Sequence, residues 1–208
     1  MKKIFIVASM SLAAVANAAG FYGGIGYGVS SVAEDIDDFN TNMVSMLGGQ
    51  INSTQSKAIN NLRLIGGYKF NENVAMEMGY VQTSKLSLTF TGTDRNSTAY
   101  NGKANASFSG LDAAVVLRPS VASGYNGLFG TIGMHNYKVK RSLSFNYGGT
   151  TSTENSSDSG TGALFGVGYD WKVDKNLDMR LSVTRLKSVG GDSESNATNF
   201  TIGLLKNF

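Results

Sequence analysis

Two neighbouring segments of alternating polarity, Leu62–Phe70 and Val74–Tyr80, constrain the fold of this chain more than any other feature. Only Asn71, Glu72 and Asn73 separate them, which is the length of a tight hairpin turn. In each segment one set of alternate residues is mostly apolar or aromatic, and the other set is mostly small or charged. A period of two places the two sets on opposite faces of a strand. Apolar residues outside and polar residues inside are typical of a barrel whose outer surface contacts lipid.

The start of the chain has the features of an export signal. Met1–Lys3 is basic, Ile4–Ala16 is apolar, and Ala16–Ala18 is a small-x-small cleavage site. We therefore expect a signal peptide over residues 1–18 and a mature β-barrel domain over residues 19–208. The apolar run is shorter than the roughly 20 residues that span a bilayer, and no later segment has 18 continuous apolar residues. With no Cys in the sequence, neither a lipid-modified cysteine nor a disulfide can form.

Composition agrees with an exported barrel. The chain has 26 Gly but a single Pro, together with 11 Phe and 9 Tyr. Aromatic residues at strand ends suit the interface girdles of an outer-membrane barrel, and glycines within strands permit curvature and close packing. Of the 18 basic residues, Lys2 and Lys3 belong to the expected signal, so 16 basic residues remain against 15 acidic ones. A formal charge of +1 gives no reason to expect a nucleic-acid partner.

The same alternation recurs along the chain and predicts eight strands. Short connections follow the second, fourth and sixth strands at Asn71–Asn73, Pro119–Tyr125 and Asp174–Asn176, while the others are longer and rich in Ser, Thr, Asn and Gly. Short periplasmic turns and long extracellular loops are typical of outer-membrane barrels. We expect an all-β fold, an eight-stranded antiparallel up-and-down transmembrane β-barrel. A soluble lipocalin-like barrel is the alternative and would place the apolar sets inside. The apolar residues expected to face outward include Phe21, Ile25, Tyr27, Val29, Leu111, Ala113, Val115, Leu117, Leu128, Ile132, Met134, Ala163, Phe165, Val167, Tyr169, Trp171, Val173, Leu177, Met179, Leu181, Val183, Phe200, Ile202, Leu204 and Phe208.

Three segments resemble small outer-membrane barrels related to the OmpA transmembrane domain. Residues 64–80 (LIGGYKFNENVAMEMGY) resemble the second hairpin of that group, and residues 166–181 (GVGYDWKVDKNLDMRL) resemble the third. Residues 202–208 (IGLLKNF) resemble the terminal strand that the barrel-assembly machinery recognises, although Lys206 stands where an aromatic residue is frequent. The resemblance implies a cell outer membrane location in a Gram-negative bacterium and a barrel without the peptidoglycan-binding domain. Members of this superfamily serve as structural proteins, adhesins and a few lipid-modifying enzymes, so the role is not implied.

Inward positions carry charges of both signs. An eight-stranded barrel is just wide enough to be filled by its own side chains, and unpaired buried charges are costly. We therefore expect a lumen plugged by paired charges, with a small ion-conducting pore as the alternative. The inward cations are Arg63, Lys69, Arg118, Lys172 and Arg180, and the inward anions are Glu77, Asp112, Asp170 and Asp178.

Candidate catalytic and metal-binding residues are scarce. His135 is the single histidine, has inward parity and has no Ser beside it, whereas lipid A deacylases of similar size place His and Ser on the outer face. We therefore expect no enzyme activity, with a lipid-modifying enzyme as the alternative. One His and no Cys exclude a His-cluster or His-Cys metal site. We assign no catalytic, cofactor-binding or metal-binding residue and expect no cofactor.

We expect a structural and adhesin-like role, in which the long loops contact other molecules at the cell surface. The first loop contains Glu34, Asp35, Asp37 and Asp38, which we interpret as a solvated acidic segment rather than a cation site. The second, about Gln82–Ala106, continues the strand alternation, and so does the third through Val139, Leu143 and Phe145, with Lys138, Lys140 and Arg141 nearby. Expected partners are outer-membrane lipid and lipopolysaccharide, the barrel-assembly machinery, and a host or surface protein.

Overall fold

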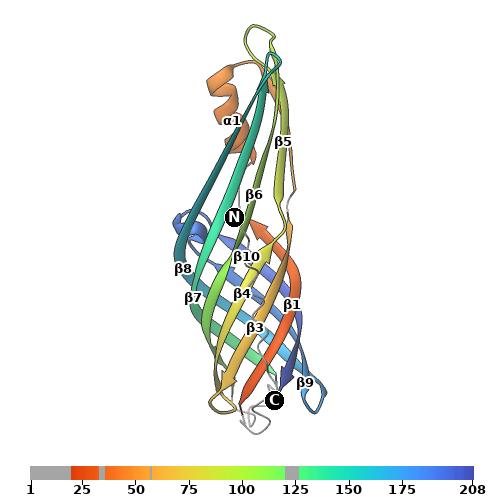
Figure 1. Ribbon diagram of the computed structural model, residues 1–208, viewed down its shortest axis with the longest axis vertical. Coiled ribbons are helices and arrows are strands. Elements are labelled where there is room, and N and C mark those ends of the chain that lie inside the picture. Colours follow the sequence, from red (N-terminus) through yellow and green to blue (C-terminus); the bar gives the residue numbers. More distant parts are fainter. Residues whose placement is uncertain (1–19, 33–35, 57, 120–126) are drawn as a thin grey trace, which may run out of the picture.

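Eight antiparallel strands form a closed ring (Figure 1). The computed structural model describes residues 20–32, 36–56, 58–119 and 127–208, and of residues 32–38 it describes no side chain. The ring closes because the first strand pairs with the last, Tyr22 lying opposite Asn207 and Val32 opposite Ala197. The fold expected from the alternating pattern is therefore confirmed. In ring order from the N-terminus the strands are β1 (Phe21–Val32), β3 (Ile59–Lys69), β4 (Val74–Thr83), β6 (Ala99–Leu117), β7 (Leu128–Tyr147), β8 (Thr150–Asp174), β9 (Leu177–Leu186) and β10 (Ala197–Asn207).

Side-chain burial follows the predicted parity. On β1, Ile25 and Tyr27 are exposed while Tyr22 and Ser30 are buried, and the barrel parts of the other ring strands largely follow the same alternation. Most of the apolar residues expected to face outward are exposed, including Ile132 and Met134, while others, such as Tyr169 and Met179, are half-buried. The apolar belt thus faces lipid, and the soluble lipocalin-like alternative is wrong. Among the described residues, no helix is long and apolar enough to cross a bilayer.

Short turns lie at one end of the barrel, and a tall extension rises from the other (Figure 1). The turns Asn71–Asn73 and Asp174–Asn176 connect β3 to β4 and β8 to β9 as predicted, while most of Pro119–Tyr125 lies outside the described residues. At the opposite end β6, β7 and β8 continue far beyond the roughly 9–11 residues that cross a membrane. β7 and β8 remain paired up to Tyr147 and Thr150, where Gly148 and Gly149 both have positive φ, as a two-residue hairpin turn requires.

The extension is a five-stranded sheet in the order β2-β5-β6-β7-β8. Two of its strands lie outside the ring, β2 (Gln50–Gln55) and β5 (Leu86–Thr93). β5 follows β4 after a break at Ser84 and Lys85 and pairs with β6, so the predicted continuation of the second loop as a hairpin is confirmed. The third loop likewise continues as the upper parts of β7 and β8.

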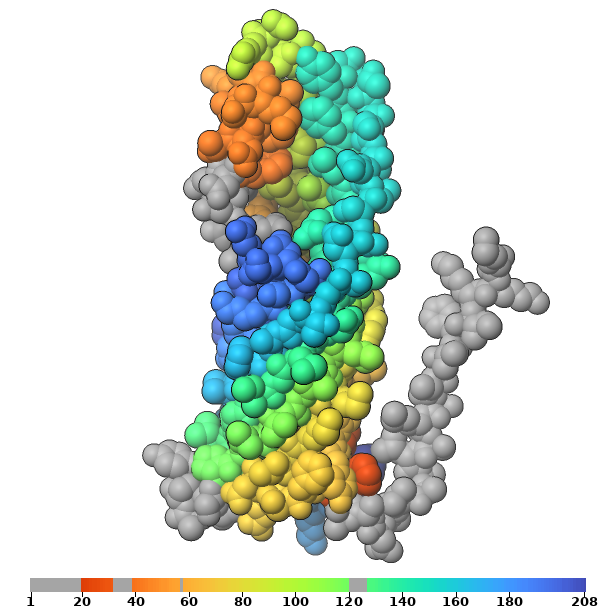
Figure 2. Space-filling view, turned by 90° about the vertical axis from the view of Figure 1, so that its left-hand side faces the viewer, coloured from red at the N-terminus to blue at the C-terminus, as the bar shows by residue number. Residues whose placement is uncertain are grey.

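A helix, α1 (Ile36–Leu47), occupies part of the first loop, for which the acidic residues predict a solvated segment. Phe39 from this helix packs against Phe90 of β5 with ring centroids 5.3 Å apart, and Ser53 of β2 donates a hydrogen bond to Asn40. The helix is thereby fixed to the extension, as Figures 1 and 2 show in orange at the top of the molecule. The side chains of Glu34, Asp35, Asp37 and Asp38 lie outside the described residues.

Candidate functional site: a charged barrel interior and an extracellular sheet

The centre of the barrel interior holds a network of ion pairs around Arg180. Arg180 of β9 donates to Glu77 of β4 and forms two further bonds with Asp170 of β8, at 2.7 and 2.9 Å. Arg118, just after β6, contacts the same Asp170 carboxylate at 3.0 Å, and the Tyr22 hydroxyl donates to Glu77 at 2.7 Å. Arg180 and Glu77 side chains are 4% and 1% exposed. A buried ion pair such as Arg180–Glu77 is favourable only because the remaining donors and acceptors of both side chains also form hydrogen bonds.

A second pair lies nearer the extracellular end. Arg63 of β3 contacts Asp112 of β6 at 2.6 Å, and the Tyr137 hydroxyl of β7 donates to the other oxygen of Asp112 at 2.9 Å. Gly79 lies between the two strands, and a Cβ there would be 2.7 Å from the Asp112 carboxylate. The glycine in this inward position therefore leaves the space that the ion pair occupies.

At the periplasmic end, Asn207 links two charged residues. Lys69 donates to the Asn207 side chain at 2.6 Å, and Asn207 donates to Asp178 at 2.9 Å, while Lys69 and Asp178 are themselves 3.9 Å apart. Lys172 departs from the prediction: it is exposed, and none of the described ion pairs includes it. The reason is its position beside a β-bulge and the β8–β9 turn, where the ammonium group reaches water instead of the packed interior.

Two buried apolar clusters also line the barrel interior. The periplasmic cluster is formed by Tyr22, Ile65, Ala75, Val116, Phe129 and Leu205. A larger extracellular cluster contains Ile59, Val81, Leu86, Phe108, Ala114, Tyr137, Val139, Leu164, Leu186, Val189 and Ala197. Buried hydroxyl and amide groups, including Ser30, Asn61 and Thr184, line the interior as well. Paired charges, apolar groups and neutral polar groups therefore share the barrel interior.

His135 lies inside the barrel, as its parity predicted. It is 1% exposed, its ring stacks on Tyr137 at 4.4 Å between centroids, and its Nε2 lies 2.8 Å from the Lys187 carbonyl oxygen. This position faces away from the lipid acyl chains. Among the described residues, no group of three His, Cys, Asp or Glu side chains is arranged to hold a metal ion.

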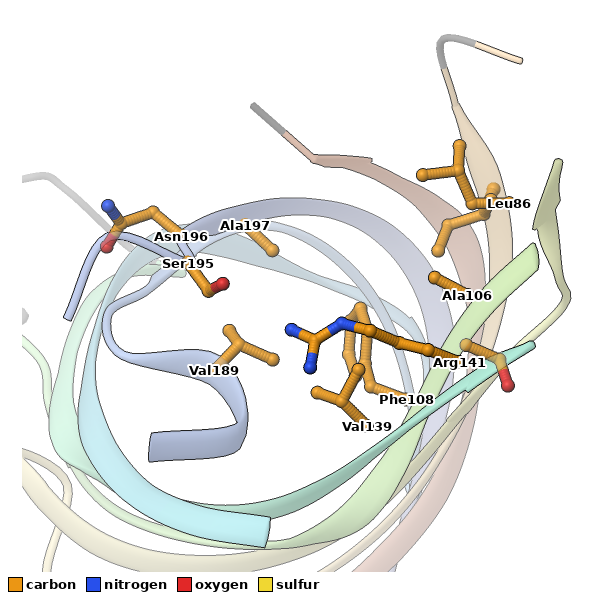
Figure 3. Close-up of a pocket in the computed structure, with 11 residues that line it drawn as sticks. Leu86, Ala106, Phe108, Val139, Arg141, Val189, Ser195, Asn196 and Ala197 are labelled. Atoms are coloured by element: carbon orange, nitrogen blue, oxygen red, sulfur yellow. The ribbon is translucent and has the colours of Figure 1, made fainter. Parts of the chain in front are cut away.

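The extracellular mouth of the barrel contains a small pocket of about 40 Å³. The last long loop reaches into it: a short 3-10 turn, η2 (Val189–Gly191), buries Val189 against the extracellular apolar cluster. Figure 3 shows Arg141 crossing the mouth above Phe108 and Val139, toward Ser195. This capping loop was not foreseen, because its sequence has no period that indicates an inward residue.

The upper part of the extension is stabilised by aromatic and carboxylate contacts. Phe145 lies 6.1 Å from Phe90 and 6.0 Å from Tyr100, between ring centroids. In the β5–β6 turn, Asp94 accepts hydrogen bonds from the Tyr147 hydroxyl and from the backbone N–H groups of Asn96 and Thr98. The Tyr147 bond, followed by the backbone bonds, holds the pKa of the Asp94 carboxyl below its ordinary value.

One edge of the extension is open. β9 pairs with β8 only up to Leu186, opposite Leu164, while β8 continues to Thr150 with β7 as its one paired neighbour. The Ala163 carbonyl accepts from the Lys187 N–H, so the backbone groups of odd-numbered β8 residues point away from β7. Further up, near Thr153, Asn155 and Ser157, these groups face no strand among the described residues.

Comparisons with known proteins agree with the fold. The profile of a family described as outer membrane protein beta-barrel domain matches residues 4–208. The crystal structure of Ail, the attachment invasion locus protein of Yersinia pestis, aligns over 91% of this chain and 99% of that chain, with 19% identity and a TM-score of 0.51. The N-terminal β-barrel domain of Pseudomonas aeruginosa OprF aligns over 91% of this chain and 98% of its own, with 12% identity and a TM-score of 0.44. The comparison with curated proteins finds no match.

Proposed function

Because the chain belongs to the family of outer membrane protein β-barrel domains, we propose that it is a surface-contact protein whose barrel supports an extracellular binding sheet. The observation that carries this proposal is the open edge of β8 in the extension. Residues 150–158 (TTSTENSSD) are all exposed and contain no Pro, Lys or bulge. Natural proteins usually protect long edge strands with such features, because unpaired backbone groups bind other strands.

An extended segment of a partner protein would add to this edge by backbone hydrogen bonds. Strand addition takes affinity from main-chain bonds and specificity from alternate side chains. Here those side chains are hydroxyls, amides and the two carboxylates Glu154 and Asp158, which favour a polar or basic partner segment. The rigid pairing of β6, β7 and β8 would hold the edge beyond the apolar belt.

The test is binding of intact cells, with and without this protein, to matrix and serum proteins. Proline at both Asn155 and Ser157 removes two N–H donors from the open edge, and proline is tolerated at edge positions. Alanine at both positions removes the same side chains but keeps the donors. We expect the proline variant to lose binding and the alanine variant to keep it. Equal binding by cells lacking the protein would contradict the proposal.

We further propose that the lumen is closed to ions. Its support is the pairing of Arg180, Arg63 and Arg118 with carboxylates inside the barrel, together with the two buried apolar clusters. In planar lipid bilayers the purified protein should show no steady conductance. A stable ion-selective current would instead favour the small-pore alternative.

We also propose that the protein is not a lipid-modifying enzyme. The single histidine is buried inside the barrel, where it stacks on Tyr137. His135→Ala should therefore leave the lipid composition of the outer membrane unchanged. A lipid product that disappears with this substitution, while folded protein remains at normal levels, would overturn the choice.

A further inference from the structure

The outer face of the extension is basic where it leaves the apolar belt. Lys138 and Lys140 of β7 and Lys85, between β4 and β5, line one groove of about 440 Å³. Asn105, Ser107 and Asn155 line the same groove and add amide and hydroxyl groups. Arg141 also lines the groove, which therefore combines four cations with neutral hydrogen-bond donors.

No acidic residue occupies the neighbouring outward positions. Across the sheet, Lys140 lies opposite Ser107 on one side and Ser157 on the other. The acidic residues of β8, Glu154 and Asp158, have the opposite parity, and Asp158 pairs with Arg141 at 2.7 Å. None of the ion pairs formed by described residues includes Lys85, Lys138 or Lys140. Three cations left close together favour binding of an anion.

The height of the groove above the apolar belt indicates which anionic groups can reach it. On β7 the apolar belt ends at Met134, and Lys138 follows four residues later. At about 3.3 Å per residue and a strand tilt of about 40°, this places Lys138 roughly 10 Å above the belt. That distance corresponds to the headgroup layer, which long lysine side chains can reach.

We propose that Lys85, Lys138 and Lys140 bind phosphate groups of lipopolysaccharide in the outer leaflet of the same membrane. The groove lies on the outer face of the sheet, so a neighbouring glycolipid would reach it laterally, without displacing the capping loop or α1. Binding there would steady the base of the extension relative to the membrane. The inference rests on the outer-membrane location and does not depend on strand addition at β8.

The experiment uses the folded protein in nanodiscs that contain either lipid A with its phosphates or the same lipid A after enzymatic dephosphorylation. The test variant is Lys138→Gln with Lys140→Gln, and the control is Lys172→Gln with Lys175→Gln, which removes the same charge at the periplasmic end. Heat-dependent migration on detergent gels verifies that each variant is folded. The readout is the affinity for a fluorescent lipid A added in trace amounts, at low and high salt.

Each lysine near the surface contributes about a factor of five to binding of anionic lipid, so the test variant should bind phosphorylated lipid A roughly 30-fold less tightly. The control variant should bind as the native protein does, and high salt should reduce the difference. Equal binding of dephosphorylated lipid A, or no effect of the test variant, would overturn the proposal. A soluble sulfated polysaccharide that binds with the same lysine dependence, while phosphorylated lipid A does not bind, would also overturn it.

Discussion

Arg180 and Glu77 meet in the middle of the barrel, although 103 positions separate them in the sequence. One comes from β9 and the other from β4, and both side chains are almost fully buried. The guanidinium also contacts Asp170 and lies over the Phe129 ring at 4.3 Å. This arrangement joins opposite walls of the barrel through one buried side chain.

Arg180→Met should strongly destabilise the barrel. The substitution keeps much of the side-chain volume but leaves Glu77 and Asp170 without their main partner, and breaking a buried pair in this way costs about 3–5 kcal/mol. Urea unfolding of the purified protein in lipid vesicles measures the change. Adding Glu77→Gln to Arg180→Met should recover part of the loss, because it removes the carboxylate that has lost its ion-pair partner, whereas Asp170 keeps Arg118. If the Arg180→Met variant and the native protein have the same urea midpoint of unfolding, the network does not stabilise the barrel.

Gly28→Ala should destabilise the seam between β1 and β10. A Cβ at Gly28 would lie 1.9 Å from the Phe200 carbonyl oxygen, so the backbone would have to move. We expect a loss of about 1–3 kcal/mol, the usual cost of overpacking. Gly66→Ala is the matched control, because a Cβ there meets no atom within 4 Å. Equal unfolding midpoints for the two variants would show that the seam accommodates the extra methyl group.

Deleting Phe208 should sharply lower membrane insertion. Its N–H donates to the Phe21 carbonyl at 3.0 Å and its ring lies at the outer surface, where we propose that the assembly machinery binds it. The Lys206 ammonium lies 5.8 Å from the same ring, near the interface, where a cation costs only about 0–1 kcal/mol. Lys206→Tyr should therefore insert as well as the native protein or better. The amount of folded protein in the outer-membrane fraction distinguishes these results, and normal insertion without Phe208 would exclude this strand as an assembly signal.

Acid should loosen the β5–β6 turn before it affects the barrel. Hydrogen bonds from Tyr147 and from the turn backbone lower the pKa of Asp94 in the folded protein. A lowered folded pKa means that this stabilisation is complete above the ordinary carboxyl pKa of about 3.9 and is lost as the pH falls through the folded value. Hydrogen exchange at residues 94–98 should therefore increase relative to the barrel strands as the pH falls below about 4, after correction for intrinsic rates. Asp94→Asn should remove most of this pH dependence.

Local sequence determined much of this structure. A period of two, read at Leu62–Tyr80, assigned the faces of the strands, because alternation depends only on backbone geometry and the preference of apolar side chains for lipid. Polar turns at Asn71–Asn73 and Asp174–Asn176 located two of the hairpins. The inward charges were also evident, since they share the parity of small residues. These inferences required no knowledge of which strands are neighbours.

Tertiary structure decided which distant groups meet. Arg180 could have paired with any inward carboxylate, and only the barrel register brings it to both Glu77 and Asp170. Lys172 has the parity of an inward residue, but its place at the barrel end leaves it in water. The open edge of β8 was also invisible in sequence, because it arises where β9 ends at Leu186 while β8 continues. Parity assigns a face to each residue, whereas register, strand length and neighbouring loops decide what that face contacts.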